Sequence, residues 1–407
     1  MENFSFRLLL RFFSRTTHGL DQRGIQDSVD GQTPPKAVVI FGARRIGKTT
    51  LLEQIVDRNT SAWYTGDSYS DIERLKLLSE GYVKTLLFQS DTLIIDEAQR
   101  IPDIGLLLKR LVDMNMTLDS PVRIFVTGSS SLELAKGIKE SAVGRLVQRQ
   151  MWPLSVTELA QAPKSSWAKV LRDLDWHLVY GMFPEVYNEP QKARILLKDY
   201  VDGILFKDLF SLGGIRLNSK FEVLVRLLAY SVGSEVSYDS LARETGLNKT
   251  TVADYITLLE QCFIVKVCPS YAKNLANELK KGKKVYFCDN GIRNAIIENF
   301  DPLPSRHDRG ALWENFFFME RVKLHSLLQD FCRIYFWRTS GKKTNELDFI
   351  EVIDGKMQAF ECKLSPKAEA KPGPDFEAAY PDCPINVVSP ATMLKVWLEV
   401  ENVSEPM

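Results

Sequence analysis

Short hydrophobic runs alternate with amphipathic stretches between residues 37 and 150. The runs at residues 37–41, about 61–65, 92–95 and 122–126 have the length and the β-branched content of buried strands. The stretches between them repeat their hydrophobic positions with a helical period. Strands that alternate with helices indicate a parallel sheet covered by helices on both faces, so we expect an α/β fold in this part of the chain.

The pattern changes to helices between residues 216 and 275. A short amphipathic helix, a glycine-containing turn and a second helix that begins after Asn248 predict a helix-turn-helix, and residues 263–267 follow as a wing strand. One use of such a unit is DNA binding, with Lys249 and Thr250 near a groove. The other is packing between protein domains, which the weakly basic second helix favours.

The hydrophobic run at residues 37–41 leads into a loop that fits the pattern G-x-x-x-x-G-K-[ST]. Between a strand and a helix, this pattern predicts a phosphate-binding loop. Its glycines let backbone amides approach phosphate oxygens, and the helix N-terminus favours negative charge. Lys48 should reach the β- and γ-phosphates, and Thr49 should bind Mg²⁺. The predicted nucleotide-binding residues are Gly42, Ala43, Arg44, Arg45, Ile46, Gly47, Lys48, Thr49 and Thr50.

Two adjacent carboxylates end the hydrophobic run at residues 92–95. Asp96 is predicted to hold Mg²⁺ together with Thr49, and Glu97 to polarise the attacking water. Because a carboxylate pair is uncommon at the end of a buried strand, the pair is the expected partner of the phosphate-binding loop.

Small hydroxyl residues end the hydrophobic run at residues 122–126. Ser129 or Thr127 could orient the γ-phosphate there, or Ser129 could cap the helix that follows. Arg145 is a candidate γ-phosphate arginine, acting within the chain or across a subunit interface. The predicted catalytic residues of the first site are therefore Lys48, Glu97, Ser129 and Arg145.

A second group of candidate residues lies near the C-terminus. Asp348 and Glu361 fall on two β-type runs joined by an Asp-Gly turn, and Lys363 is two residues beyond Glu361. Residues two apart on a strand share a face, so Glu361 and Lys363 should point together toward Asp348. The carboxylates could hold Mg²⁺, with Glu314 as a third acid. The alternative is an ordinary hairpin with a surface Glu–Lys pair. The spacing resembles the D…E-x-K core of the PD-(D/E)xK nuclease superfamily.

Composition narrows the choice of partners and compartment. Equal numbers of basic and acidic residues, 52 each, exclude a global basic field for nucleic acid. The six cysteines form no C-x-x-C pair, which indicates reduced thiols and a cytoplasmic protein without a zinc site. No hydrophobic run is long enough to span a membrane. The basic, hydrophobic stretch at residues 4–15 is interpreted as a helix packed on the protein core, with a transit peptide or a membrane-surface helix as alternatives.

The order of these features resembles a prokaryotic AAA-plus ATPase family whose members carry a C-terminal domain of unknown function with a restriction-endonuclease-like fold. The resemblance covers roughly residues 35–390 and adds Lys284 to Gly291 and the stretch around Glu314 to the motifs above. It implies ATP rather than GTP as the nucleotide. The expected domains are an N-terminal helix and linker (1–36), an ATPase core (37–150), a helical lid or connector packed on that core (151–215), a winged helix (216–275) and a nuclease-like α/β domain (276–407).

Two functions are compatible with this organisation. One is an ATPase whose hydrolysis drives the winged-helix and nuclease-like domains on DNA. The other is a nucleotide-dependent switch or scaffold that binds a partner protein through a catalytically silent nuclease-like domain. A homo-oligomer is required if Arg145 acts across an interface.

Overall fold

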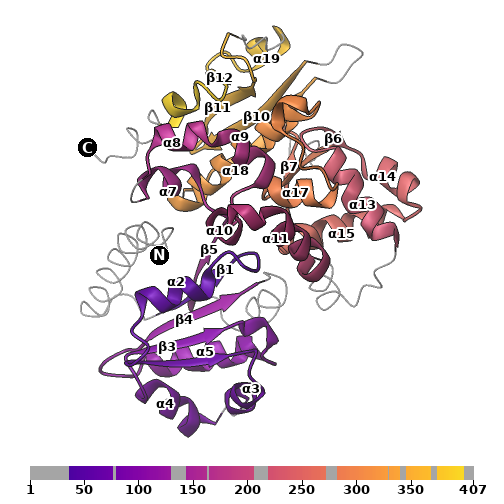
Figure 1. The fold of residues 1–407 in the computed structure, drawn as a ribbon. Helices are drawn as coiled ribbons and strands as arrows, with labels where there is room; N and C mark the ends of the chain where they lie inside the picture. Colours follow the sequence, from indigo (N-terminus) through magenta and orange to yellow (C-terminus); the bar gives the residue numbers. More distant parts are fainter. Residues whose placement is uncertain are drawn as a thin grey trace. The chain divides into compact units, whose positions relative to one another are not determined.

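A computed structural model shows the chain as two compact units (Figure 1). The first unit is Met1–Leu154 with Gln161–Lys164 and Gln261–Phe263, and the second is Ser155–Ala160, Ser165–Glu260 and Ile264–Met407. The structure describes residues 36–76, 79–129, 144–162, 165–205, 219–271, 282–328, 330–339, 345–367 and 374–397. The predicted helix at residues 4–15 and its linker lie outside the described residues.

The first unit is built on a five-stranded parallel sheet with the order β2-β3-β4-β1-β5. Helix α2 covers one face, and α3, α4 and α5 cover the other (Figure 1). The strands are β1 Ala37–Phe41, β2 Ser61–Thr65, β3 Thr92–Asp96, β4 Arg123–Gly128 and β5 Leu146–Gln150. The helices are α2 Lys48–Ile55, α3 Tyr69–Leu75, α4 Glu80–Phe88 and α5 Ile104–Asn115, with a short 3₁₀ turn η1 at Ala98–Arg100.

Two central strands of this sheet are buried almost completely. All five residues of β3 are buried, as are the last five of β4. Burial on both faces explains why their hydrophobic runs are continuous rather than alternating. The predicted parallel α/β fold is therefore observed, and the strand ends that were expected to carry chemistry lie at one edge of the sheet.

In the second unit, helix α17 (Asn290–Ile296) packs against α9 (Leu174–Tyr180) and α11 (Ala193–Tyr200). Asn294 on α17 donates hydrogen bonds to the carbonyl oxygens of Leu178 and Val179 on α9, at 3.3 and 2.8 Å. The sequence predicts a helical lid or connector at residues 151–215, and these contacts lie within the second unit. Its packing on the ATPase core stays a prediction. The helices are α7 Val156–Gln161, α8 Trp167–Arg172, α9 Leu174–Tyr180, α10 Pro184–Asn188, α11 Ala193–Tyr200 and α17 Asn290–Ile296, with short turns η2 Pro190–Lys192, η3 Val201–Leu205 and η4 Leu303–Ser305.

The middle of the second unit combines three helices with a small antiparallel sheet. The helices are α13 Ser219–Tyr230, α14 Tyr238–Thr245 and α15 Lys249–Gln261, and the strands are β6 Glu235–Val236, β7 Val265–Pro269 and β8 Lys283–Phe287. Gly246 ends α14 with a positive φ of 65°, and Asn248 caps α15 by accepting a hydrogen bond from the amide of Thr251 at 2.7 Å. The sheet order is β6-β8-β7.

The last part of the second unit packs the long helix α18 against a four-stranded sheet of order β12-β11-β10-β9. The elements are α18 Arg309–Leu328, β9 Arg333–Arg338, β10 Glu346–Ile353, β11 Lys356–Cys362, α19 Pro374–Ala379 and β12 Ile385–Val388. Asp354 and Gly355 both have positive φ, at 48° and 79°, so the predicted Asp-Gly hairpin turn is present. Buried aromatic residues such as Trp313 and Phe317 join the helix to the sheet.

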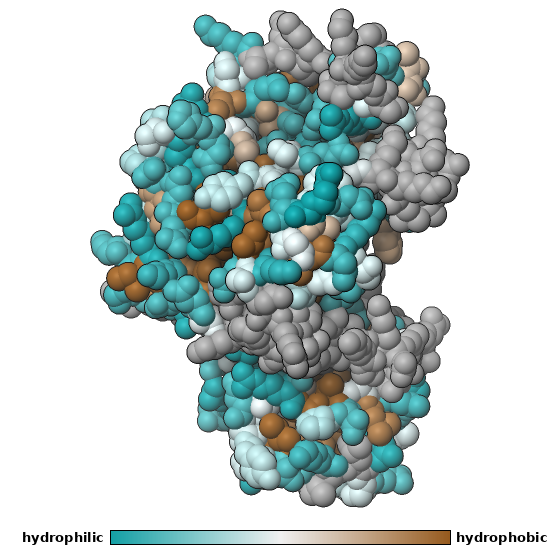
Figure 2. Space-filling model, turned by 90° about the vertical axis from the view of Figure 1, so that its right-hand side faces the viewer, coloured by the Kyte–Doolittle hydropathy of each residue, from teal (hydrophilic) through white to brown (hydrophobic). Residues whose placement is uncertain are grey.

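Hydrophilic residues cover most of the described surface on the face drawn in Figure 2, and hydrophobic residues gather there in small separate patches. Within the described ranges, no helix is both long and hydrophobic enough to cross a bilayer.

Candidate functional site

The loop between β1 and α2 has the backbone that its two glycines require. A Cβ at Gly42 would lie 2.4 Å from the carbonyl oxygen of Met151, so no larger residue fits there. Gly47 has a φ of 93°, which strongly favours glycine. It caps α2 without any side-chain hydrogen bond to the first turn. Of the nine predicted nucleotide-binding residues, residues 42–47 thus form the turn and residues 48–50 begin α2, an arrangement suited to an anion.

The first residues of α2 face the end of β3. The ammonium of Lys48 is buried and donates hydrogen bonds to the carbonyl oxygens of Gly42 and Ala43 at 3.0 and 2.9 Å, so it lies inside the loop. Thr49 Oγ1 donates to Asp96 Oδ2 at 2.9 Å. The two residues predicted to hold Mg²⁺ therefore already bring their oxygens together, although 47 positions separate them in the chain.

A hydroxyl at the end of β4 ties the two carboxylates to the neighbouring strand. Thr127 Oγ1 donates to Asp96 Oδ1 and accepts the backbone amide of Glu97 at 3.1 Å. Thr127 is fully buried, and Glu97 has a positive φ of 49° as the chain turns out of β3. This backbone conformation separates the directions of the two adjacent carboxylates: Asp96 faces Thr49, whereas Glu97 turns toward Gln99.

Gln99 is a member of this site that the sequence does not reveal. Its Nε2 donates to Glu97 Oε2 and to Ser129 Oγ, the latter at 2.8 Å, and its Oε1 accepts the amide of Ser129 at 3.3 Å. Gln99 thus links Ser129 to Glu97, and the role of Ser129 toward the γ-phosphate stays a prediction. Its alternative role as a helix cap concerns residues 130–135, which lie outside the described residues.

Arg145 lies at the opposite edge of the sheet from the loop. Its carbonyl oxygen accepts the amide of Ala37, the first residue of β1, at 3.1 Å, and its guanidinium pairs with Asp113 near the end of α5. Because β1 and β5 run parallel, a residue that precedes β5 is one strand length away from the loop that follows β1. The prediction that Arg145 contacts the γ-phosphate within its own chain is therefore wrong. Its role across a subunit interface stays a prediction.

The second predicted site assembles around a bulge in β10. The pairing of β9 with β10 shifts register between Leu347 and Ile350, which re-aims Asp348. Asp348 Oδ2 accepts the backbone amide of Cys362 at 2.7 Å, so it lies beside the end of β11 where Glu361 and Lys363 are found. Lys363 donates from Nζ to Glu361 Oε1. Glu361 Oε2 is buried, and none of the described residues hydrogen-bonds to it.

Glu314 on α18 joins this group through residues that sequence reasoning missed. Lys284 Nζ on β8 lies 3.1 Å from Glu314 Oε1, 2.7 Å from Glu346 Oε1 and 3.9 Å from Asp348 Oδ1. Tyr286, two residues further along β8, donates to Glu314 Oε1 at 2.7 Å. A lysine and a tyrosine spaced to share one face of a strand were the only sequence signal for them.

Burial and charge shift the titration of this acid cluster. Burial raises the pKa of Asp348 well above its usual value, and the neighbouring carboxylates of Glu314 and Glu361 raise it further against the attraction of Lys284. Burial opposes the charge of Lys284, but the three carboxylates around its ammonium raise its pKa. The raised pKa values therefore favour the charged form of Lys284 and the protonated form of Asp348.

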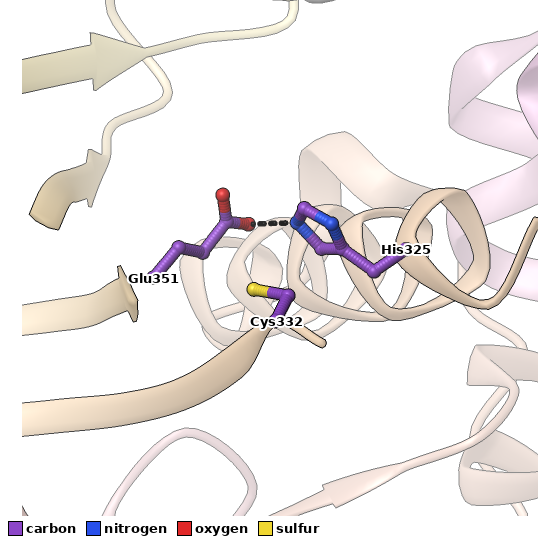
Figure 3. A group of neighbouring side chains, drawn as sticks. All are labelled: His325, Cys332 and Glu351. Atoms are coloured by element: carbon purple, nitrogen blue, oxygen red, sulfur yellow. Dashed lines mark ion pairs between the residues drawn. The ribbon is translucent and has the colours of Figure 1, made fainter. Parts of the chain in front are cut away.

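A compact group of metal-ligating residue types, His325, Cys332 and Glu351, lies at the end of α18 (Figure 3). In the described part of the chain, it is the one group of three whose ligand atoms all lie within 4.8 Å of one another. Glu351 is already neutralised, because Arg321 donates to both of its oxygens at 2.7 and 2.6 Å. His325 also contacts Asp330, at 2.8 Å from Nδ1. We therefore interpret the group as a buried ion network.

Comparison with known proteins separates the chain into three regions. Residues 34–160 match a family described as AAA domain, residues 171–303 a domain of unknown function (DUF8612), and residues 309–399 another domain of unknown function (DUF4143). An uncharacterized protein of Mycobacterium tuberculosis is 27% identical over 329 residues, which cover 80% of this chain and 70% of that protein. An uncharacterized protein of Methanocaldococcus jannaschii is 25% identical over 309 residues, which cover 70% of this chain and 66% of the relative.

Solved structures add little to this comparison. A variant of RuvB from Thermotoga maritima aligns with 62% of this chain and 88% of its own, but with a TM-score of 0.31 and 17% identity. A TM-score this low does not establish that the two proteins share an overall fold. The match of residues 34–160 and the geometry of the loop, Asp96 and Glu97 together support an AAA-type ATPase built on a P-loop.

Proposed function

We propose that the first unit binds Mg·ATP and hydrolyses it to ADP and phosphate. The observation that carries this proposal is the 2.9 Å hydrogen bond between Thr49 and Asp96, which brings the loop and the end of β3 together beside the buried Lys48. These are the positions at which P-loop enzymes bind phosphate and its metal ion.

Each residue of the site has a distinct role in the proposed reaction. The amides of the loop and the ammonium of Lys48 bind the phosphates and offset their charge. Thr49 Oγ1 and Asp96 are neighbouring hard oxygen donors, a donor set that fits Mg²⁺. When bound there, the ion would neutralise charge on the β- and γ-phosphates. Glu97 orients and polarises the water that attacks the γ-phosphorus, and Gln99, which is itself bonded to Ser129, holds Glu97 in place.

Calorimetry on the full chain tests the proposal. Titration with Mg·ATP should give heat of binding, and Lys48→Ala should weaken binding by about a hundredfold or more, because the phosphates lose a buried positive charge. Glu97→Gln should keep binding but hydrolyse at least about a hundredfold more slowly. Titration with Mg·GTP decides the base specificity. Absence of binding heat with both nucleotides for folded wild-type protein would refute the proposal.

We further infer that the nucleotide state acts on the second unit. The order helix, strand, helix, helix, strand, strand from α13 to β8, with the sheet order β6-β8-β7, supports the predicted winged helix. The second helix of the helix-turn-helix is α15. It exposes Lys249, Thr250, Asp254 and Thr257, and Lys249 is paired with Asp239. A helix with this charge is poorly suited to phosphate contacts, so the observation favours a role in protein packing over DNA reading.

A metal-dependent nuclease is the second candidate function, carried by the convergence of Asp348, Glu361 and Lys363 at the end of β11. Asp348 and Glu361 supply oxygen donors that fit Mg²⁺ or Mn²⁺, and the unpartnered oxygen of Glu361 supports an open ligand position. If this candidate is right, the full chain should nick supercoiled plasmid in Mn²⁺ and Asp348→Ala should abolish nicking. No nicking in any nucleotide state, together with binding of a partner protein, would favour the switch or scaffold with a silent nuclease-like domain.

A further inference from the structure

Lys284 is a buried cation in the middle of the acid cluster of the second unit. Its side chain is 1% exposed, and its ammonium touches carboxylates from two different elements: Glu346 on β10 at 2.7 Å and Glu314 on α18 at 3.1 Å. Asp348 lies 3.9 Å away, and the ring of Phe336 covers the ammonium at 5.7 Å. The side chain thus reaches inward from β8 to the point where the acids meet.

The acids of the cluster fall into two sets around two lysines. Lys284 holds Glu314 and Glu346, and Lys363 holds Glu361. Asp348 lies between the two sets, with its Oδ1 facing Lys284 and its Oδ2 bound to the amide of Cys362. Lys363 is 39% exposed and can move away into solvent, whereas Lys284 is enclosed.

The acids are also spread more widely than a preassembled metal site requires. Glu314, Asp348 and Glu361 are not among the described groups whose ligand atoms all lie within 4.8 Å of one another. Glu314 is further occupied by the hydroxyl of Tyr286, at 2.7 Å from the same oxygen that faces Lys284. With Lys284 in place, Glu314 is therefore held by protein partners, and its role as a third metal-binding acid stays a prediction.

We propose that the ammonium of Lys284 occupies the place that a divalent cation would otherwise share between Glu314 and Asp348, and so limits this site to one weakly held cation on Asp348 and Glu361. The proposal rests on the second candidate function, because it concerns the same acids. A dication brought within a few ångströms of the ammonium is repelled at short range in a poorly screened interior. Lys284 is thus a residue that determines how many metal ions the site takes and how tightly.

Removal of the ammonium without a change of shape gives a direct test. In Lys284→Met, Glu314, Glu346 and Asp348 lose their common cation, and a divalent or trivalent ion can replace it. Lys283→Met is the matched control, since it removes one positive charge from the adjacent position of the same strand, where Lys283 packs over the ring of Tyr238. Every protein also carries Asp96→Asn, so that metal binding in the first unit does not contribute.

Binding of Mn²⁺ to the full chain is measured by calorimetry, and binding of Tb³⁺ by its luminescence on tyrosine excitation, because Tyr286 adjoins Glu314. Lys284→Met should bind Mn²⁺ at least about tenfold more tightly than wild type, which corresponds to about 1.4 kcal/mol at 25 °C. It should also show stronger Tb³⁺ luminescence and a larger rise in melting temperature with Mn²⁺. Lys283→Met should behave like wild type.

The outcomes distinguish this proposal from the nuclease candidate. Weak binding by wild type with tight binding by Lys284→Met supports the role of Lys284, whether or not plasmid is cut. Tight binding by wild type that Lys284→Met does not improve overturns the role of Lys284 but leaves the nuclease candidate standing. No binding by either protein overturns both. If Lys284→Met does not fold by circular dichroism, Lys284→Gln, which keeps hydrogen-bond donors toward Glu346 and loses only the charge, must show the same tightening.

Discussion

The side-chain amide of Gln99 bonds to Ser129 in both directions, since Nε2 donates to the hydroxyl at 2.8 Å and Oε1 accepts the backbone amide at 3.3 Å. The same Nε2 donates to Glu97. Gln99 thus connects the end of β4, next to the proposed γ-phosphate position, to the carboxylate proposed to act on water. A change at either end can be transmitted to the other through one side chain.

Replacement of Gln99 by Leu should slow hydrolysis without weakening nucleotide binding. We expect kcat to fall by about tenfold and the Kd for Mg·ATP to stay within about twofold, because Glu97 loses its orientation while the loop is untouched. Steady-state ATPase assays and calorimetry measure the two quantities. Gln148→Leu, on the exposed side of β5, is the control. Equal losses in kcat and in binding would contradict a positioning role for Gln99.

Arg145 and Asp113 form a partly exposed ion pair at the edge of the sheet away from the loop. We expect Arg145→Ala and Asp113→Asn to lower the free energy of unfolding by similar amounts, about 1 kcal/mol or less, and to leave ATP hydrolysis within about twofold of wild type. Denaturant titration and ATPase assays check this. Loss of activity in Arg145→Ala alone, and only at protein concentrations that favour assembly, would instead show that the arginine acts on a neighbouring subunit.

His177 should make the protein sensitive to acid. Burial lowers its pKa to about 4, and its Nδ1 has no hydrogen-bond partner among the described residues. The unfolded chain takes up a proton on this histidine near pH 6.5, whereas the folded protein does so only near pH 4. Protonation therefore favours the unfolded chain, and the free energy of unfolding that is present above pH 6.5 is lost as the pH falls toward 4. Between pH 7.5 and 5.0 the loss should be about 2 kcal/mol.

His177→Phe isolates this contribution. Phenylalanine keeps an aromatic ring against Tyr187, which stacks on His177 at 6.1 Å between ring centroids. The variant should lose less stability than wild type between pH 7.5 and 5.0 in denaturant titrations, with the buried acids Glu158 and Asp289 common to both proteins. Parallel acid profiles for the two proteins would show that the pKa of His177 is not lowered in the folded protein.

His325 should have the opposite pH dependence. Burial alone would lower its pKa, but Glu351 at 3.2 Å and Asp330 at 2.8 Å outweigh burial and raise it (Figure 3). A raised pKa stabilises the folded protein below pH 6.5, and this contribution is lost as the pH rises through the folded-state value. The stability difference between wild type and His325→Gln should therefore be larger at pH 6 than at pH 9. Burial raises the pKa of Cys332, so its thiol stays neutral over this range.

Local pattern was sufficient to predict the elements that carry the first site. The runs at residues 37–41 and 92–95 become β1 and β3 almost without change, because strands that are buried on both faces leave a continuous hydrophobic signature. The run at residues 61–65 becomes β2, which is mostly half-buried. The loop itself is specified by two glycines with steric or conformational constraints at Gly42 and Gly47. The predicted turns at Gly246 and Asp354-Gly355 are also present.

Contacts between distant segments were not predictable in the same way. Arg145 looks like any arginine near a strand, and only the parallel register of β1 and β5 places it at the far edge. Lys284 lies 64 positions before Asp348, and nothing in its own neighbourhood indicates that its ammonium faces an acid. The position of the Gln99 side chain beside Glu97 and Ser129 depends on the turn that the chain makes at Glu97, after β3. Each of these cases needs the three-dimensional arrangement, which residue spacing does not contain.

The hydrogen bond from Trp397 Nε1 to Thr157 Oγ1, at 2.8 Å, joins residues 240 positions apart. During synthesis, the strands of the first unit and α7 are therefore complete long before Trp397, the partner of Thr157 on α7, has been added to the chain. Until then the start of the second unit has no partner for this part of its core, and the growing chain exposes hydrophobic surface that chaperones recognise. Truncated chains that end before residue 397 are expected to aggregate or to be degraded in the cell rather than to accumulate as folded protein.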